Sequence, residues 1–374
     1  MKWCRKCVLP NTRPNLSFNK DGICSGCLNH NKKNKINWSK RQSKLYTLIK
    51  EIKSSPSEYD CLIPVSGGKD STWQTIKCLE LGLKPLAITW KTPSRTTIGS
   101  ENLKNLIDLG VDHIDFTVNP KIESNFMWET YKRKGSIAIP MHFAIYSIPF
   151  RVASNFKIPL IVFGENSAFE YGMNENEDSF SVTPEWIDLY NATVGTKIED
   201  WFSNDFQEND LTLYRRPKDN VLKKSNIKAI FLGHYFEWDP KNTKILAEKA
   251  GFKSSKEGPK IGLYDFADID CNFISLHHWL KWYKFGFTRL FDNLSLEIRN
   301  NRISREDAIK LIEKADFNPS GDDLDKFCEF TKHTKREFFE IAEKFRNRSI
   351  WKKIPGKDNK WYIPNFIINK EIWN

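Results

Sequence analysis

Short apolar runs alternate with amphipathic segments along the first two thirds of the chain. The runs have the length and composition of buried β-strands and lie at 59–65, 84–90, 113–118, 158–163 and 227–232. The helical spacing of apolar residues predicts helices over 45–52, 70–81, 101–109, 144–155 and 243–250. This alternation predicts a parallel, doubly wound α/β sheet, in which ligands bind at the carboxyl ends of the strands.

Beyond Gly262 the pattern is almost entirely helical. The segment 273–285 is rich in aromatic residues, Ser304 and Asp307 resemble a capping box, and 335–346 is amphipathic. We therefore expect a cysteine module, an α/β domain and a helical C-terminal region, over residues 1–40, 41–260 and 261–374.

Composition narrows the class of protein. Of the 374 residues 40% are hydrophobic and 13% aromatic, which is enough to build a core. No apolar run approaches the roughly 18 residues of a transmembrane helix, and Cys4 lies where a signal peptide would place apolar residues. We expect a soluble, cytoplasmic protein without membrane contact. The net charge of +11 fits a nucleic acid, an anionic nucleotide substrate or an acidic partner, and does not choose between them.

The eight cysteines of a cytoplasmic chain do not indicate a disulfide framework. Four of them form two C-x-x-C pairs close to the N-terminus: Cys4, Cys7, Cys24 and Cys27. This spacing is typical of a zinc knuckle or ribbon, in which four thiolates surround one ion. Because four cysteine ligands leave no position open for water, we expect the zinc to be structural and not catalytic.

The first predicted strand leads into the segment SGGKDS, which consists of Ser66, Gly67, Gly68, Lys69, Asp70 and Ser71. Glycines let the backbone approach an anion closely, and the N–H groups that open the next helix point towards it. The segment is not a Walker A sequence, because Asp70 follows the Gly-Lys pair where Ser or Thr is expected. We predict a phosphate-binding loop; a glycine-rich turn without a ligand is the alternative.

SGGKDS after a strand resembles the PP-loop of the ATP pyrophosphatase superfamily. Members of that superfamily activate a carbonyl oxygen as an adenylate, release pyrophosphate and let a nitrogen or sulfur nucleophile attack. The resemblance implies that the loop binds the phosphates of ATP and that Lys69 stabilises the departing pyrophosphate. It also implies that Asp70 or Glu165 binds Mg²⁺.

Two other predicted strands end at the same edge of the sheet. The strand at 158–163 is followed by Gly164, Glu165 and Asn166. We predict that Glu165 binds Mg²⁺ on the phosphates and that Asn166 or Ser167 contacts the substrate; a turn that caps the next helix is the alternative. Thr89 and Trp90 end the strand at 84–90, and we predict that they lie on the adenosine side of the pocket; Gly164 is a further candidate for binding the cofactor.

Several motifs together resemble those of the N-acetyl sugar amidotransferase family of lipopolysaccharide and nonulosonic acid biosynthesis. The resemblance covers most of the chain, through CRKCVLPNTRP, SGGKDST, FGENSAFEYG and the stretch 277–308. It implies an ATP-dependent ligase that converts an acetamido group of a free or nucleotide-linked sugar into an acetamidino group. Ammonia would come from a glutaminase that works with a barrel subunit, both resembling the histidine-pathway pair, because the chain has no recognisable glutaminase residues of its own.

The candidates for contact with the sugar are Asn166, Glu170, Tyr171, His142 and His234. Histidines without a surrounding motif are more often packed or solvated than catalytic. Asp292 and Arg299 lie on a predicted helix and are further candidates, although an ion pair between helices explains them equally well.

A PP-loop tRNA thiolase is the main alternative, because PP-loop proteins with cysteine-rich N-terminal modules also modify tRNA and this chain is basic. Such enzymes commonly carry a further cysteine pair near the active site, whereas Cys61, Cys78 and Cys271 stand singly here. A non-enzymatic adaptor that only senses ATP would be expected to have a damaged loop, and the loop is intact. We therefore expect no nucleic acid partner.

Overall fold

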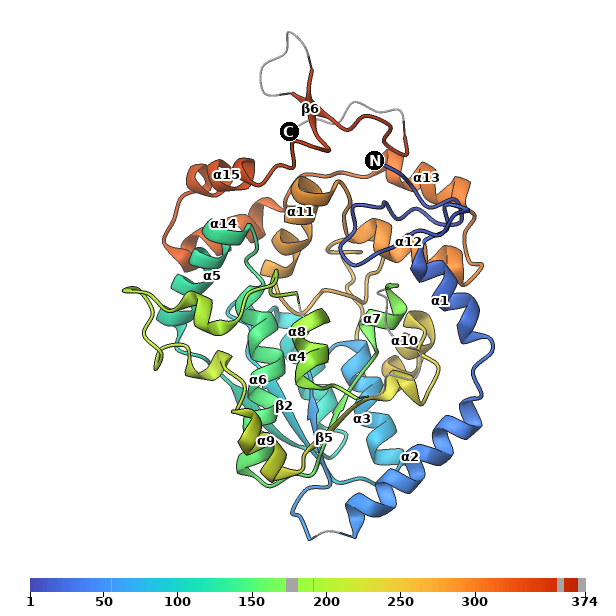
Figure 1. Ribbon diagram of the computed structural model, residues 1–374, viewed down its shortest axis with the longest axis vertical. Coiled ribbons are helices and arrows are strands. Elements are labelled where there is room, and N and C mark those ends of the chain that lie inside the picture. Colours follow the sequence, from blue (N-terminus) through green and yellow to red (C-terminus); the bar gives the residue numbers. More distant parts are fainter. Residues whose placement is uncertain (55, 173–180, 191, 355–359, 369–374) are drawn as a thin grey trace.

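The computed structural model describes residues 1–54, 56–172, 181–190, 192–354 and 360–368. A five-stranded parallel sheet forms the centre of the lower part of the molecule in Figure 1. Its strands are β1 (Cys61–Pro64), β2 (Pro85–Trp90), β3 (Asp112–Phe116), β4 (Leu160–Phe163) and β5 (Lys228–Phe231). The strand order is β3-β2-β1-β4-β5, so the direction of the chain along the sheet reverses between β1 and β4.

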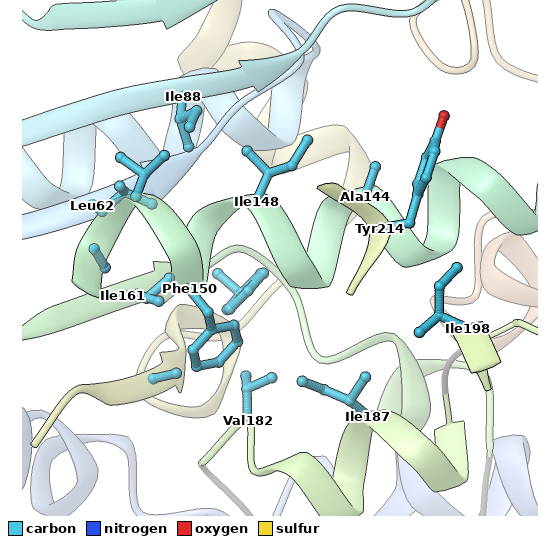
Figure 2. Close-up of a cluster of buried hydrophobic side chains, with 14 of the residues drawn as sticks. Leu62, Ile88, Ala144, Ile148, Phe150, Ile161, Val182, Ile187, Ile198 and Tyr214 are labelled. Atoms are coloured by element: carbon cyan, nitrogen blue, oxygen red, sulfur yellow. The ribbon is translucent and has the colours of Figure 1, made fainter. Parts of the chain in front are cut away.

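Helices cover both faces of the sheet. Side chains alternate between the two faces along each strand, so the apolar strands expose apolar side chains on both faces, and both have to be buried. The helices of this part are α2 (Trp38–Lys53), α3 (Lys69–Glu80), α4 (Thr97–Ile107), α5 (Pro120–Lys134), α6 (Ile139–Asn155), α7 (Ser167–Glu170), α8 (Pro184–Tyr190), α9 (Asp219–Ser225) and α10 (Pro240–Lys249). On β1, Cys61 and Ile63 share a core with α2, α3 and α4, whereas Leu62 shares a core with α5, α6 and α8. Figure 2 shows part of the second core, around Phe150 of α6. The predicted doubly wound sheet is confirmed.

The region after the sheet is helical, as predicted. Its helices are α11 (Phe273–Phe285), α12 (Arg289–Arg299), α13 (Arg305–Lys314), α14 (Gly321–Thr331) and α15 (Lys335–Lys344). A short antiparallel pair, β6 (Lys352–Lys353) and β7 (Trp361–Tyr362), follows them and was not expected, because two-residue strands have no periodicity that a sequence can display. Among the described residues, we find no helix with both the length and the apolar character that a bilayer span requires.

The N-terminal module packs on this helical region, where both lie in the upper part of Figure 1. Its only long helix within the described residues, α1 (Ser25–Lys33), begins directly after Cys24. The four cysteines share a core with Phe291 and Leu294 of α12 and with Ala308 of α13. The beginning of the chain is therefore buried against residues that come almost three hundred positions later.

Candidate active site

Two cavities meet at the carboxyl ends of β1 and β4, where the strand order reverses. The larger has a volume of about 420 Å³ and the smaller of about 220 Å³. The residues that line both are Ser66, Asp70, Ser71, Glu165, Asp268 and Asp270. The phosphate loop after β1 and a group of four carboxylates thus form the common wall of the two cavities.

The phosphate loop is held in shape by its own hydrogen bonds. The Ser71 hydroxyl accepts from the backbone N–H groups of Ser66 and Gly67 at 3.3 and 3.2 Å and donates to the Gly68 carbonyl at 2.9 Å. Gly67 has a φ of +87°, and a Cβ there would lie 2.6 Å from the backbone nitrogen of Leu103. Only glycine fits this position without strain. Because α3 begins at Lys69, its N-terminus lies at the smaller cavity, a position suited to an anion.

Lys69 and Asp70 are engaged with each other and with an aromatic wall. Their side chains form an ion pair. Asp70 also accepts a hydrogen bond from the Trp238 indole at 2.8 Å and one from the Thr243 hydroxyl at 3.3 Å. The Lys69 ammonium lies 5.6 Å from the centre of the Trp238 ring and is almost completely buried. Both side chains are therefore held at the cavity by α10 and the loop before it.

Glu165, Asp268 and Asp270 of the common wall have perturbed pKa values. Burial, and then repulsion by Asp70, raise the pKa of Glu165 to about 7. Burial raises the pKa of Asp270 to about 6. Burial alone would raise the pKa of Asp268 as well, but the Arg289 guanidinium, whose Nε donates to it at 2.7 Å, holds that pKa well below its usual range. The wall therefore combines one firmly ionised carboxylate with others that would gain from a cation.

A Mg²⁺ ion fits this chemistry. Crowded carboxylates that repel one another are relieved by a divalent ion, and oxygen is the ligand that Mg²⁺ prefers. Within the described ranges, the cysteines are the only metal-type side chains whose ligand atoms all lie close enough to surround one ion. The carboxylates are therefore not a closed cage, which suits Mg²⁺, since it commonly binds through one or two carboxylates together with substrate phosphates and water.

The predicted adenosine contacts lie in the wall of the larger cavity. Thr89, Trp90 and Gly164 all line it. The Thr89 hydroxyl donates to the Val65 carbonyl at 2.7 Å, so it fixes the two strand ends to each other. The Trp90 indole donates to Glu123 at 3.0 Å, which orients the ring. The opposite wall is mostly apolar and comes from α6 and α11.

The five predicted sugar contacts are not brought together. Among these described residues, only Tyr171 lines one of the two cavities, the smaller one. Asn166 caps α7 by accepting from the Phe169 N–H at 3.2 Å, as the capping alternative expects. Glu170 forms an ion pair with Lys33, and His234 lies in a separate groove beside β5.

His142 lies behind the larger cavity rather than in its wall. Its ring is 6.1 Å from that of His277, which does line the cavity. Burial lowers the pKa of His142 to about 4. Asp292 forms an ion pair with Arg13 at 2.8 Å, so it has a structural partner, although Arg13 lies in the N-terminal module outside any helix and the pair does not join two helices.

Sequence reasoning missed residues that the segment before α11, α11 itself and α12 contribute to the cavities. Asp268, Asp270, Cys271 and His277 all line the larger cavity, and Arg289 lines the smaller one. The segment reaches the site because residues 271–272 pair with residues 94–95 beyond the end of β2. Two aspartates in an irregular segment, far along the chain from the phosphate loop, give no periodic signal.

The four N-terminal cysteines form a compact, fully buried cluster. Their sulfur atoms all lie within 4.8 Å of one another, and those of Cys7 and Cys24 are 3.6 Å apart. Tetrahedral zinc with Zn–S distances of about 2.3 Å requires sulfurs about 3.8 Å apart. The backbone N–H groups of Cys7 and Cys24 point at the Cys4 sulfur, at 3.4 and 3.3 Å. The residues fit a zinc ion, and none of the four lines the cavities at the sheet.

Comparison with known proteins identifies the C-terminal part of the chain. Residues 263–363 match the family described as LPS biosynthesis protein WbpG-like, C-terminal domain. This match includes α11 and α12, which contribute His277 and Arg289 to the cavities. No curated protein matches the chain significantly.

Two solved structures are similar to the chain at low identity. One is a predicted subunit of tRNA methyltransferase from Methanocaldococcus jannaschii, with 17% identity, a TM-score of 0.27, and coverage of 50% of this chain and 75% of that one. The other is NMN synthetase from Francisella tularensis, with 12% identity, a TM-score of 0.34, and coverage of 81% and 96%. Both TM-scores lie below 0.5, so neither structure bears on the function of this chain.

Proposed function

We propose that this protein is an ATP-dependent amidotransferase of lipopolysaccharide biosynthesis. It would convert an acetamido group of a sugar, free or linked to a nucleotide, into an acetamidino group. The observation that carries the proposal is the wall shared by two cavities, in which a phosphate-binding loop faces four carboxylates. The WbpG-like match of residues 263–363 supports the pathway.

The two cavities suggest a division of roles. The larger, mostly apolar cavity suits a nucleoside base against Trp90, and the N-terminus of α3 suits the phosphates. Lys69 and Arg289 are the cations of the smaller cavity, where they suit the departing pyrophosphate. Asp70 and Glu165 would hold Mg²⁺, which when bound neutralises phosphate charge as a Lewis acid.

The reaction needs an activated amide. The amide oxygen attacks the α-phosphorus of ATP, an O–P bond forms, and the bond to pyrophosphate breaks. The loop N–H groups and Lys69 hold the negative charge that leaves. Ammonia then attacks the carbon of the adenylated imidate, and AMP departs with the former amide oxygen. The residues of the wall thus act on the phosphates, and the chain needs no nucleophile of its own.

Ammonia is the second substrate. We propose that a glutaminase subunit and a barrel subunit that resemble the histidine-pathway pair deliver it. A high concentration of ammonium should replace both in a test with the purified protein.

The decisive experiment measures AMP and pyrophosphate release with ATP, Mg²⁺, ammonium and a panel of nucleotide-linked diacetamido sugars, with products identified by mass spectrometry. We expect AMP only when a suitable sugar is present, and a product in which C=NH replaces C=O. AMP formation with bulk tRNA and a sulfur donor, but with no sugar, would refute the proposal in favour of the thiolase.

A variant of Cys271 offers a second way to distinguish the amidotransferase from the thiolase. It is the one cysteine of the chain in the wall of the larger cavity, and burial raises the pKa of its thiol to about 11. A protonated thiol is a poor nucleophile. Cys271→Ser should therefore retain amidotransferase activity, whereas a thiolase that uses this sulfur would lose its activity.

A further inference from the structure

The cysteine module packs directly on the segment that carries Glu165. α1 contacts α7, which begins two residues after Glu165. A Cβ at Gly172 would lie 2.2 Å from the backbone nitrogen of Gly26, so the two backbones touch. The Ser25 hydroxyl donates to the Gly172 carbonyl, and Asn29 donates to the carbonyl of α7 residue 169 at 3.2 Å. The module therefore holds the segment after β4 by packing and by hydrogen bonds to its backbone.

A buried lysine extends this support to the phosphate loop. Lys33, at the end of α1, forms an ion pair with Glu170 of α7 at 2.8 Å, and the two side chains are only 5% and 8% exposed. The same ammonium donates to the Trp238 carbonyl at 2.6 Å. The Trp238 indole donates to Asp70 at 2.8 Å. One side chain of the module is thus connected to α7 and, through Trp238, to Asp70.

A buried arginine joins the cysteine cluster to the same turn. The Nη1 atom of Arg299 donates to the Glu170 carbonyl at 3.0 Å, and its Nη2 atom lies 3.8 Å from the Cys24 sulfur. Arg299 is 3% exposed and fills the space above Gly26. A buried cation that loses one of its partners is strongly destabilised, so this guanidinium holds the cluster and α7 in a fixed relation.

We propose that the cysteine module positions the active-site carboxylates, with Lys33 and Arg299 as positioning residues. Neither residue lines the two cavities at the sheet, so each acts through others: Lys33 through Glu170 and Trp238, Arg299 through the backbone of α7. This inference rests on the proposed function.

The test uses Lys33→Met in the full chain, which keeps most of the length of the side chain and removes its charge. The matched control is Lys32→Met, on the same helix but exposed. We expect Lys33→Met to keep its zinc and its KM for ATP, to lose roughly tenfold or more in kcat, and to exchange amide hydrogens faster at residues 164–172 only. Lys33→Arg should restore most of the activity. Arg299→Lys, which loses the planar fork, should reproduce the pattern of Lys33→Met.

Two results would overturn the inference. The first is a Lys33→Met protein with the kcat and the exchange of the wild type. The second is faster exchange throughout the sheet together with a lower unfolding midpoint, which would mean a general structural role. If the wild type cleaves no ATP under any condition, the proposed function fails separately. Exchange confined to residues 164–172 then still supports the positioning role, and unchanged exchange overturns it.

Discussion

The ionised carboxylate of Glu165 should make the folded protein less stable, because in the folded state it loses contact with water and lies near another negative charge. Its pKa is raised from 4.5 to about 7, first by burial and then by Asp70. The ionised carboxylate is therefore disfavoured in the folded state by about 3 kcal/mol. Lys69 and Arg289 face the same carboxylate and offset part of this cost, which that pKa already includes.

The sign of the pH dependence follows from this raised pKa. Below pH 4.5 the carboxyl group is protonated in the folded and the unfolded chain, so it costs nothing. As the pH rises towards 7, the unfolded chain releases the proton while the folded chain retains it, and stability falls. Above about pH 7 the full cost is present. Glu165→Gln removes the charge and should therefore stabilise the protein at pH 8 by up to about 3 kcal/mol, and hardly at pH 4.5.

Urea unfolding at several pH values, without added ATP or Mg²⁺, measures this difference. The matched control is Glu329→Gln on α14, where the carboxylate is exposed. Glu165→Gln should also cleave ATP at least tenfold more slowly than the wild type. An equal gain at both pH values, or none at pH 8, would refute the picture of a partly buried carboxylate that a neighbouring charge repels.

Three further predictions concern the phosphate loop and the cysteine cluster. Asp70→Ala should abolish AMP formation while the circular dichroism spectrum stays that of the wild type; retained turnover would refute the PP-loop mechanism. Gly67→Ala should lower the unfolding midpoint and weaken ATP binding roughly tenfold or more, because its φ of +87° and the Leu103 backbone leave no room for a Cβ. Gly321→Ala, with open space around it, should do neither, and calorimetry of both variants checks this. Cys24→Ser should lose zinc, measured by elemental analysis, and lower the unfolding midpoint; an unchanged midpoint would exclude a structural metal.

The sequence predicts those features best that depend on residues close together in the chain. The strand that ends before Ser66 is a buried apolar run, and Gly67 and Gly68 are typical of a turn. The sequence therefore predicts both the strand and the turn correctly. The cysteine pairs were found because metal spacing is a short-range signal, and their sulfurs do converge. The PP-loop residues stay predicted ligands, although the loop and Glu165 lie in one wall as expected.

Contacts between residues far apart in the chain could not be predicted from the sequence. Asp268 and Arg289 line the smaller cavity although they lie almost 200 residues or more after the phosphate loop along the chain, and no short-range pattern around them predicts that. The position of Asn166 and Glu170 after an active-site strand predicts contact with the sugar, whereas in the structure Asn166 caps α7 and Glu170 forms an ion pair with Lys33. The division into three parts stays a prediction.

The cover of the cysteine cluster has a consequence for synthesis of the protein. Arg299 contacts the Cys24 sulfur, and Arg305 contacts the carbonyls of Cys4 and Cys7, yet both arginines are made more than 270 residues after the cysteines that they contact. Until then the thiols cannot reach the burial that they have in the folded chain. The nascent chain therefore lacks this cover throughout the synthesis of the residues between Cys27 and α12, and a version shortened before α12 would never gain it.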